Sequence, residues 1–314
     1  MATLALRRIA MAFPTLLGVT VVIWLLLSIL PGDPLAFLLP QDASPADRAR
    51  LAAELGLDRP LPVRYINWLF DVLRGDFGYS PFRRREVADL IAAAWKNTAL
   101  LAGFSAAFGL TIGISLGTLA GVYRGSAVDR FVTGLAVVGL SVPSFWVAIL
   151  LLIVFSAQLK VLPAGGMATL DAGPVAFLKH LVMPVISGSM VSIAITARVT
   201  RASIVETFKA EFVDTLRAKG LRERQVLLHV AKNAVSPVLT TTGLQVGFLL
   251  GGSVLIETIF SWPGLGQLVF NAIAARDLRV VQATTVVIAG TFVLLNLLVD
   301  LLQMTFDPRQ KRAA

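Results

Sequence analysis

The side chains best suited to chemistry are concentrated in one polar segment, 198–232, of an otherwise apolar chain. The segment carries eight basic and four acidic residues. Its apolar side chains recur every four positions, which is typical of one face of an amphipathic helix: Ile204, Phe208, Phe212 and Leu216. Gly220 favours the left-handed conformation that ends a helix, and Leu227, Val230 and Ala231 predict a second helix after it. An apolar face flanked by charges suits noncovalent docking to another protein.

Two other interpretations of this segment remain open. A solvated loop that only keeps positive charge in the cytoplasm would explain the basic residues, but not the regular apolar stripe or the glycine. A DNA-binding helix-turn-helix would need a free domain with its own core, whereas both ends of 198–232 run directly into apolar stretches. The pattern therefore favours a helix that docks into a groove on a soluble partner.

Residue sets typical of catalysis are absent from the sequence. There is no cysteine, which excludes disulfides and thiolate metal sites. The two histidines, His180 and His229, are too few for a metal centre and are expected at the membrane edges, without a serine to activate. No G-x-x-x-x-G-K-[ST] phosphate loop occurs, and the lone Gly-Leu-Gly at 264–266 lacks the strand and helix that such a site requires. We therefore expect no enzyme activity, no metal and no bound cofactor in this chain.

The composition is that of a membrane protein. The chain has 314 residues, 56% hydrophobic and only 15% charged, with a mean hydropathy of +0.78. Six runs without Asp, Glu, Lys or Arg approach or exceed the roughly 18–20 residues of a helical span: 9–32, 97–123, 131–159, 180–197, 233–256 and 280–299. A seventh run, 258–275, is interrupted by Pro263, Gly264 and Gly266, and predicts a membrane-edge loop with a short helix. We therefore predict an all-α integral membrane protein with six transmembrane helices.

The distribution of charge orients these spans. Six crossings put both termini on one side, and the basic start and end of the chain assign that side to the cytoplasm. The inner segments then have a net charge of +8 and the outer ones +1. The chain divides into an N-terminal tail with an uncleaved first span (1–32), a small outer segment (33–96) and a five-helix core (97–314).

Small residues predict how the spans pack. Glycines recur every four residues along the second and fifth spans, which lets another backbone approach one face of each helix: Gly109, Gly113, Gly117, Gly121, Gly243, Gly247 and Gly251. Packing within one subunit is favoured over lining a transport path. Pro143 predicts a kink in the third span. The polar residues within the spans are mostly uncharged, such as Gln245 and Asn296, which argues against a proton-coupled carrier.

Motifs along nearly the whole chain resemble one family. The stretch DTLRAKGLRERQVLLHVAKNAVSPV resembles the cytoplasmic EAA loop of ATP-binding-cassette (ABC) importer permeases, in the form found in dipeptide, oligopeptide and nickel permeases. The resemblance extends through PTLLGVTVVIWLLLSILPGDP, LDRPLPVRYINWL, LRGDFGYS, VPSFW, VLPAGG, ETIFSWPGLGQL and ARDLRVVQ. The chain is thus similar to the inner membrane component of a binding-protein-dependent transport system.

The resemblance implies a type I ABC importer permease fold with a small periplasmic insertion at 33–96 and a coupling (EAA) loop at 198–237. Such a permease lies in the bacterial inner (cytoplasmic) membrane among its lipids, as a multi-pass protein with both termini cytoplasmic. The implied partners are a second homologous permease, two ABC ATPase subunits that bind ATP and Mg, and a periplasmic or lipid-anchored substrate-binding protein. No nucleic acid is expected.

The implied function is transmembrane transport of di- and oligopeptides, with this chain forming half of the translocation path. Nickel, glutathione and oligosaccharides are alternative substrates for the same importer type. A self-sufficient channel or membrane enzyme is a remote alternative.

The resemblance also carries individual residues. Asp214, Thr215 and Leu216 occupy the positions of the motif's Glu-Ala-Ala, and Gly220 that of its glycine, while the motif's later Leu-Pro is absent at 232–233. The implied ATPase-coupling residues are Asp214, Thr215, Arg217, Ala218, Lys219, Gly220, Leu221, Arg222 and Glu223. The outer segments 33–96 and 258–282 should meet the binding protein, and the path or its outer gate is expected at Ser261, Trp262 and Pro263.

Overall fold

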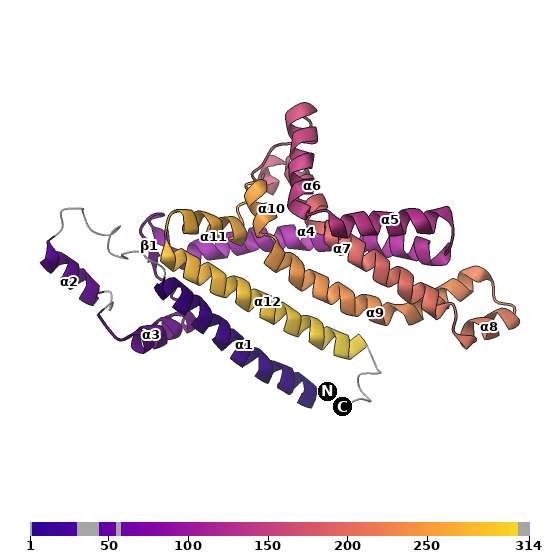
Figure 1. The fold of residues 1–314 in the computed structure, drawn as a ribbon, viewed down its shortest axis with the longest axis horizontal. Helices are drawn as coiled ribbons and strands as arrows, with labels where there is room; N and C mark the ends of the chain where they lie inside the picture. Colours follow the sequence, from indigo (N-terminus) through magenta and orange to yellow (C-terminus); the bar gives the residue numbers. More distant parts are fainter. Residues whose placement is uncertain (1, 30–43, 55–57, 307–314) are drawn as a thin grey trace.

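The long helices run along one axis and form an elongated bundle (Figure 1). The computed structural model describes residues 2–29, 44–54 and 58–306, so the basic C-terminal tail and positions 33–43 of the predicted outer segment lie outside the described residues. The bundle consists of α1 (Ala2–Ile29), α4 (Val87–Val122), α5 (Ala127–Ser141), α7 (Pro174–Thr207), α9 (Glu223–Gly252) and α12 (Leu278–Phe306).

Each of these helices contains most of one predicted span, or its first part in the case of α5. Several helices extend well beyond the charge-free run that predicts them, because the backbone hydrogen bonds of a helix can continue from the hydrocarbon region of a membrane into water. Among the described residues, three helices are long and apolar enough to cross a membrane: Val87–Val122, Pro174–Thr207 and Leu278–Val299. A fourth crossing results if the bent pair Ala127–Ser141 and Ser144–Gln158 is one span. The full count of six crossings stays a prediction.

The third predicted span is not one kinked helix. It consists of α5 and a second helix, α6 (Ser144–Leu151), which continues as a π-helix at Leu152–Gln158. The two parts meet at 98°, so α6 projects away from the bundle (Figure 1). The break falls at Val142 and Pro143, both of which have extended backbones. Proline disfavours helical geometry in the residue before it, and here it ends one helix and starts the next.

The helices α4 and α7 form the most extensive helix pair in the described structure. Gly109, Gly113, Gly117 and Gly121 of α4 all face α7, as expected of a contact between small residues. At Gly117 an added Cβ would lie 2.5 Å from the Ala197 carbonyl oxygen, so no larger residue fits without moving a backbone.

The glycines of α9 are less uniform. Gly243 is buried, and a Cβ at Gly247 would lie 2.8 Å from Oδ1 of Asn296 on α12. Gly251 lies within α9, but its surroundings are outside the described structure. Gly247 therefore faces α12 at close range, whereas the stripe on α4 faces α7.

Most of the other connecting segments lie at the two ends of the bundle, whereas α6 and the loop after it project from its middle (Figure 1). One end carries α2 (Pro45–Glu54), α3 (Leu61–Leu73) and a two-stranded antiparallel hairpin, β1 (Tyr79–Ser80) and β2 (Arg85–Glu86), in which Tyr79 pairs with Glu86 and Ser80 with Arg85. The hairpin lies beside α11 (Leu265–Ala274), which follows α10 (Val254–Ile259). The other end carries α8 (Glu211–Ala218), toward which the start of α1 and the end of α12 also point. A single helical turn, Leu170–Ala172, precedes α7.

Candidate functional site

The polar segment at the α8 end forms a short helix between two turns. The helix α7 ends at Thr207, and Ala210 has an extended backbone that separates it from α8. Gly220 has φ +79°, as predicted for a glycine that ends a helix, and α9 begins at Glu223. The stripe expected on one helix is therefore divided between the end of α7, the turn after it and α8. Glu211 and Asp214 occupy the first turn of α8, where acidic side chains interact favourably with the helix dipole.

The apolar stripe packs against this chain's own helices. Ile204 and Val213 are buried with three residues of α9, and Phe208, Phe212, Leu216 and Leu221 pack around them. The buried α9 residues are Val226, Val230 and Ala234. We call these nine residues the coupling-loop cluster. The expectation that this stripe enters a groove on a partner is wrong. The stripe instead packs against α9 of the same chain, because this removes its apolar surface from water, whereas a helix facing outward would leave that surface exposed.

The opposite face of α8 is polar and exposed. Eight of the nine predicted coupling residues are exposed, and Leu221 is half-buried. The guanidinium of Arg217 donates to both carboxylate oxygens of Glu223, at 2.9 and 3.3 Å, which joins the end of α8 to the start of α9 across Gly220. Hydrogen bonding by Arg217 lowers the pKa of the Glu223 carboxyl. The Arg222 N–H donates to Oε1 of Gln225 at 3.0 Å, which caps α9. The exposed face of this segment is thus a charged turn, with α8 and α9 joined across Gly220 by the ion pair of Arg217 with Glu223.

An ion pair between a buried carboxylate and a partly exposed arginine connects helices near this end of the bundle. Asp129, at the start of α5, is only 4% exposed and accepts two hydrogen bonds from Arg201 of α7, at 2.5 and 2.8 Å. The Gly125 N–H donates to the same carboxylate at 2.8 Å. Asp129 is not among the predicted site residues, although the sequence places it three residues after the Ser126 that caps α5. The pair fixes the turn between α4 and α5 against α7.

At the other end, Glu257 organises the loop between α10 and α11. Its side chain is fully buried and accepts hydrogen bonds from the hydroxyls of Thr98 (2.7 Å) and Ser253 (2.9 Å). It also accepts from the N–H groups of Gly266 (2.7 Å) and Gln267 (3.2 Å) in the first turn of α11. Glu257 is not among the predicted residues, because in the sequence it only separates the charge-free runs 233–256 and 258–275. An isolated acid shortly before a helix start was the available indication.

The three residues expected at the path or outer gate occupy two different environments. Trp262 is fully buried and donates from its indole N–H to the Asn97 carbonyl at 2.9 Å. Ser261 and Pro263 are exposed, Ser261 with φ +48°, and the Pro263 carbonyl accepts from the Asn97 side chain at 2.8 Å. In this conformation the loop is thus tied to α4, with Trp262 inside the subunit's own core.

A second outer contact joins the hairpin to α12. The hydroxyl of Ser80 donates to the carboxylate of Asp277, and both residues are almost completely buried. Asp277 also accepts from the N–H of Val280 at 3.4 Å, at the start of α12. The motifs LRGDFGYS and ARDLRVVQ therefore meet in space. Among the described residues, no group of three His, Cys, Asp or Glu side chains is placed to bind a metal.

Comparison with known families gives matches over most of the chain. Residues 113–312 match the model described as "Binding-protein-dependent transport system inner membrane component". Residues 1–101 match the corresponding N-terminal model.

Known relatives match this chain over almost the full length of both proteins. The chain is 40% identical to a Brucella suis biovar 1 protein whose name describes it as a peptide permease, over 98% of both chains. It is 36% identical to the dipeptide transport system permease protein DppB of Escherichia coli K12, over 97% of both chains. Among solved structures, an inward-facing form of the MetNI methionine ABC transporter is similar, with a TM-score of 0.56 and 16% identity over 69% of this chain and 96% of that one. At this identity the structural likeness concerns the fold alone.

Proposed function

Because the chain belongs to the family of binding-protein-dependent transport system inner membrane components, we propose that it carries di- and oligopeptides across the bacterial inner membrane. It is a permease subunit of an ABC importer and not itself an enzyme, since separate ATPase subunits hydrolyse the ATP in such importers. In our proposal the chain forms half of the translocation path, and a second, homologous permease forms the other half.

One observation carries the peptide assignment. Relatives that match this chain over 97% or more of both lengths, at 36–40% identity, are named as peptide or dipeptide permeases. The uptake experiment would also detect transport of the alternative substrates, which are nickel, glutathione and oligosaccharides.

The geometry of α8 supports a role in coupling to the ATPase subunits. Its apolar side is buried in the coupling-loop cluster, so a displacement of α8 would be transmitted directly to α7 and α9. Its exposed side presents the charged turn from Asp214 to Glu223, which suits docking by hydrogen bonds and ion pairs. We propose that two ATPase subunits, which bind ATP and Mg, contact one such turn on each permease.

The orientation of the bundle is part of the proposal. The start of α1 and the end of α12 point to the α8 end, which agrees with both termini being cytoplasmic (Figure 1). The hairpin, α3 and the loop around Trp262 would then face the periplasm, where a binding protein delivers substrate.

The mechanism that follows is alternating access. Closure of the ATPase pair would push on α8, and the bundle would switch the side to which the path opens. The hydrogen bonds between Asn97 and the loop at Trp262 and Pro263 would hold the outer end of α4 against α11 in one of these states. Ser261, Trp262 and Pro263 are thus our candidates for an outer gate.

The test is uptake by the complete importer. The chain is reconstituted into proteoliposomes with its co-purifying permease and ATPase subunits, and labelled di- and oligopeptides are added with the binding protein. We expect ATP-dependent accumulation of peptide. ATP-dependent accumulation of nickel, glutathione or an oligosaccharide, without accumulation of peptide, would move the substrate assignment to that class. Transport without any ATPase subunit would contradict the importer function.

A further inference from the structure

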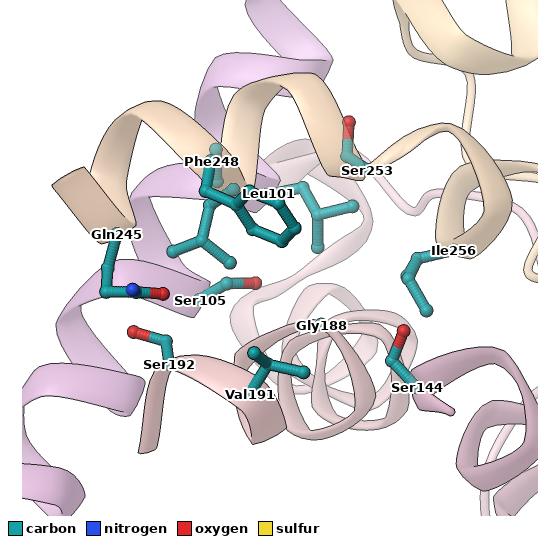
Figure 2. Close-up of a pocket in the computed structure, with 12 residues that line it drawn as sticks. Leu101, Ser105, Ser144, Gly188, Val191, Ser192, Gln245, Phe248, Ser253 and Ile256 are labelled. Atoms are coloured by element: carbon teal, nitrogen blue, oxygen red, sulfur yellow. The ribbon is translucent and has the colours of Figure 1, made fainter. Parts of the chain in front are cut away.

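Five uncharged polar side chains line a cavity in the middle of the bundle (Figure 2): Ser105, Ser144, Ser192, Gln245 and Ser253. The cavity lies between α4, α6, α7, α9 and α10 and has a volume of about 50 Å³. Ser105 lies near the middle of α4, Ser192 near the middle of α7, and Gln245 within the apolar run that predicts the fifth span. Phe248, Leu101 and Ile256 contribute apolar walls.

Burying the polar groups at this cavity costs free energy. Ser105 is 2% exposed, Ser192 1% and Gln245 9%. The hydroxyl oxygen of Ser192 is fully buried, and within the described part of the chain it has no hydrogen-bond partner. Figure 2 shows the Gln245 carboxamide and the hydroxyls of Ser105 and Ser192 on the same side of the cavity. A buried polar group without a partner costs free energy, and more so at mid-membrane depth, where water is scarce.

The chemistry of the lining indicates what would occupy it. No lining residue carries a charge, so the site does not suit a metal cation or a carboxylate. The carboxamide of Gln245 donates and accepts hydrogen bonds, as do serine hydroxyls, and together they match an amide N–H and C=O. Phe248 is 59% exposed, which places one wall of the cavity at the surface of the subunit.

We propose that this cavity is a cargo-contact site that takes one backbone amide group of a peptide passing along the path. Its volume suits a few water molecules or a single amide group, not a whole peptide. The peptide would therefore slide past the opening, with its amide groups replacing one another at the site. This inference rests on the peptide-transport function proposed above.

The absence of cysteine from the sequence allows a direct test. Ser192→Cys introduces the only thiol of this chain into the cavity, and the probe is a membrane-impermeant methanethiosulfonate reagent. It is added to the reconstituted importer, and the mass of this chain is measured. During ATP turnover we expect labelling of the cysteine, slowed severalfold by a transported peptide. Ser189→Cys is the matched control, since Ser189 is a fully buried serine of the same helix that does not line the cavity. It should stay unlabelled.

A second variant measures the contact without a thiol. Gln245→Leu removes the carboxamide and should reduce peptide uptake at low concentration about tenfold, while binding-protein-stimulated ATP hydrolysis is retained. Gln158→Leu, at an exposed position of the π-helix Leu152–Gln158 that does not line the cavity, should leave uptake unchanged.

The outcomes separate the site from the function. No labelling of Ser192→Cys during turnover, or labelling that a transported peptide does not slow, would overturn the cargo-contact site. Peptide uptake at the wild-type level by an importer with Gln245→Leu would also overturn the cargo-contact site. Failure of the unmodified importer to take up any peptide would instead overturn the proposed function.

Discussion

Single buried residues determine the conformation of the loop between α10 and α11. The two carboxylate oxygens of Glu257 accept four hydrogen bonds, two of them from the otherwise unpaired N–H groups at the start of α11. A Cβ at Gly264 or Gly266 would collide with this carboxylate, so both glycines are required for its close approach. One acidic side chain thus joins α4, α10 and α11.

Replacing Glu257 should therefore destabilise the protein. In Glu257→Ala the buried donors of Thr98, Gly266 and Gln267 lose their acceptor, and we expect a loss of at least about 2 kcal/mol. The measurement is the thermal unfolding midpoint of the purified chain in detergent. Glu257→Gln, which keeps one acceptor oxygen, should lose less. The control is Glu206→Gln, at an exposed carboxylate. Equal midpoints for Glu257→Ala and this control would show that the hydrogen bonds contribute nothing.

At the scale of elements, the contact between α4 and α7 depends on the absence of side chains from one face of α4. A Cβ at Gly117 would lie 2.5 Å from a backbone oxygen and 2.7 Å from Cβ of Thr200. At Gly103 of the same helix, an added Cβ would meet no neighbouring atom within 4 Å. Replacing each of these two glycines by alanine therefore separates the effect of packing from the effect of helix propensity within one helix.

We expect Gly117→Ala to destabilise the protein by about 1–3 kcal/mol, since α7 must move to relieve the clash. Gly103→Ala should be neutral or slightly stabilising, because alanine is the better helix former. The same detergent unfolding assay measures both variants. A midpoint for Gly117→Ala at or above that of Gly103→Ala would mean that the helices separate easily.

The turn after α8 depends on a left-handed glycine. Gly220 has φ +79°, and no neighbouring atom lies within 4 Å of the position of an added Cβ, so a substitution acts through backbone strain alone. Gly125, in the turn between α4 and α5, has the same φ and equal space. The pair offers matched strain at two different turns.

Gly220→Ala and Gly125→Ala should each cost about 1–2 kcal/mol in their own turn. Only the first should weaken assembly with the ATPase subunits, because only that turn carries the predicted docking face. Gly220→Pro should have a stronger effect while leaving membrane insertion intact. Co-purification of the ATPase subunits with the tagged permease measures assembly. Wild-type yields with Gly220→Pro would remove α8 from the docking model.

At the scale of the whole molecule, the docking turn and the bundle are connected by apolar packing. Val213 of α8 is fully buried against Val226 and Val230 of α9 and Ile204 of α7. Well-packed interiors transmit displacement, whereas a cavity absorbs it. The efficiency of coupling should therefore depend on this cluster, separately from the strength of docking.

Val213→Ala should leave ATPase assembly unchanged, because the exposed face of α8 is intact, but should lower the amount of peptide imported per ATP hydrolysed. Parallel assays of uptake and phosphate release in proteoliposomes give this ratio. Val137→Ala, at an exposed position of α5, is the control. An unchanged ratio for Val213→Ala would indicate that force reaches the bundle by another route.

The sequence by itself determined the features that depend on local periodicity and composition. Apolar runs located the long helices, the four-residue glycine spacing on α4 indicated its close contact, and Gly220 indicated a left-handed helix end. The family followed from motifs distributed along the whole chain. These patterns are readable because each depends on residues near one another in sequence.

Only the tertiary structure decided which partners each side chain meets. The stripe that includes Phe212 and Leu216 looked available to another protein, yet it is covered by α9. Pro143 separates two helices at 98°, an angle that no local pattern specifies. Glu257 and Asp129 bind residues at sequence separations of up to 159 and 72. Such pairings depend on how the helices pack, because burial and hydrogen bonding are satisfied in three dimensions and leave no fixed spacing in the sequence.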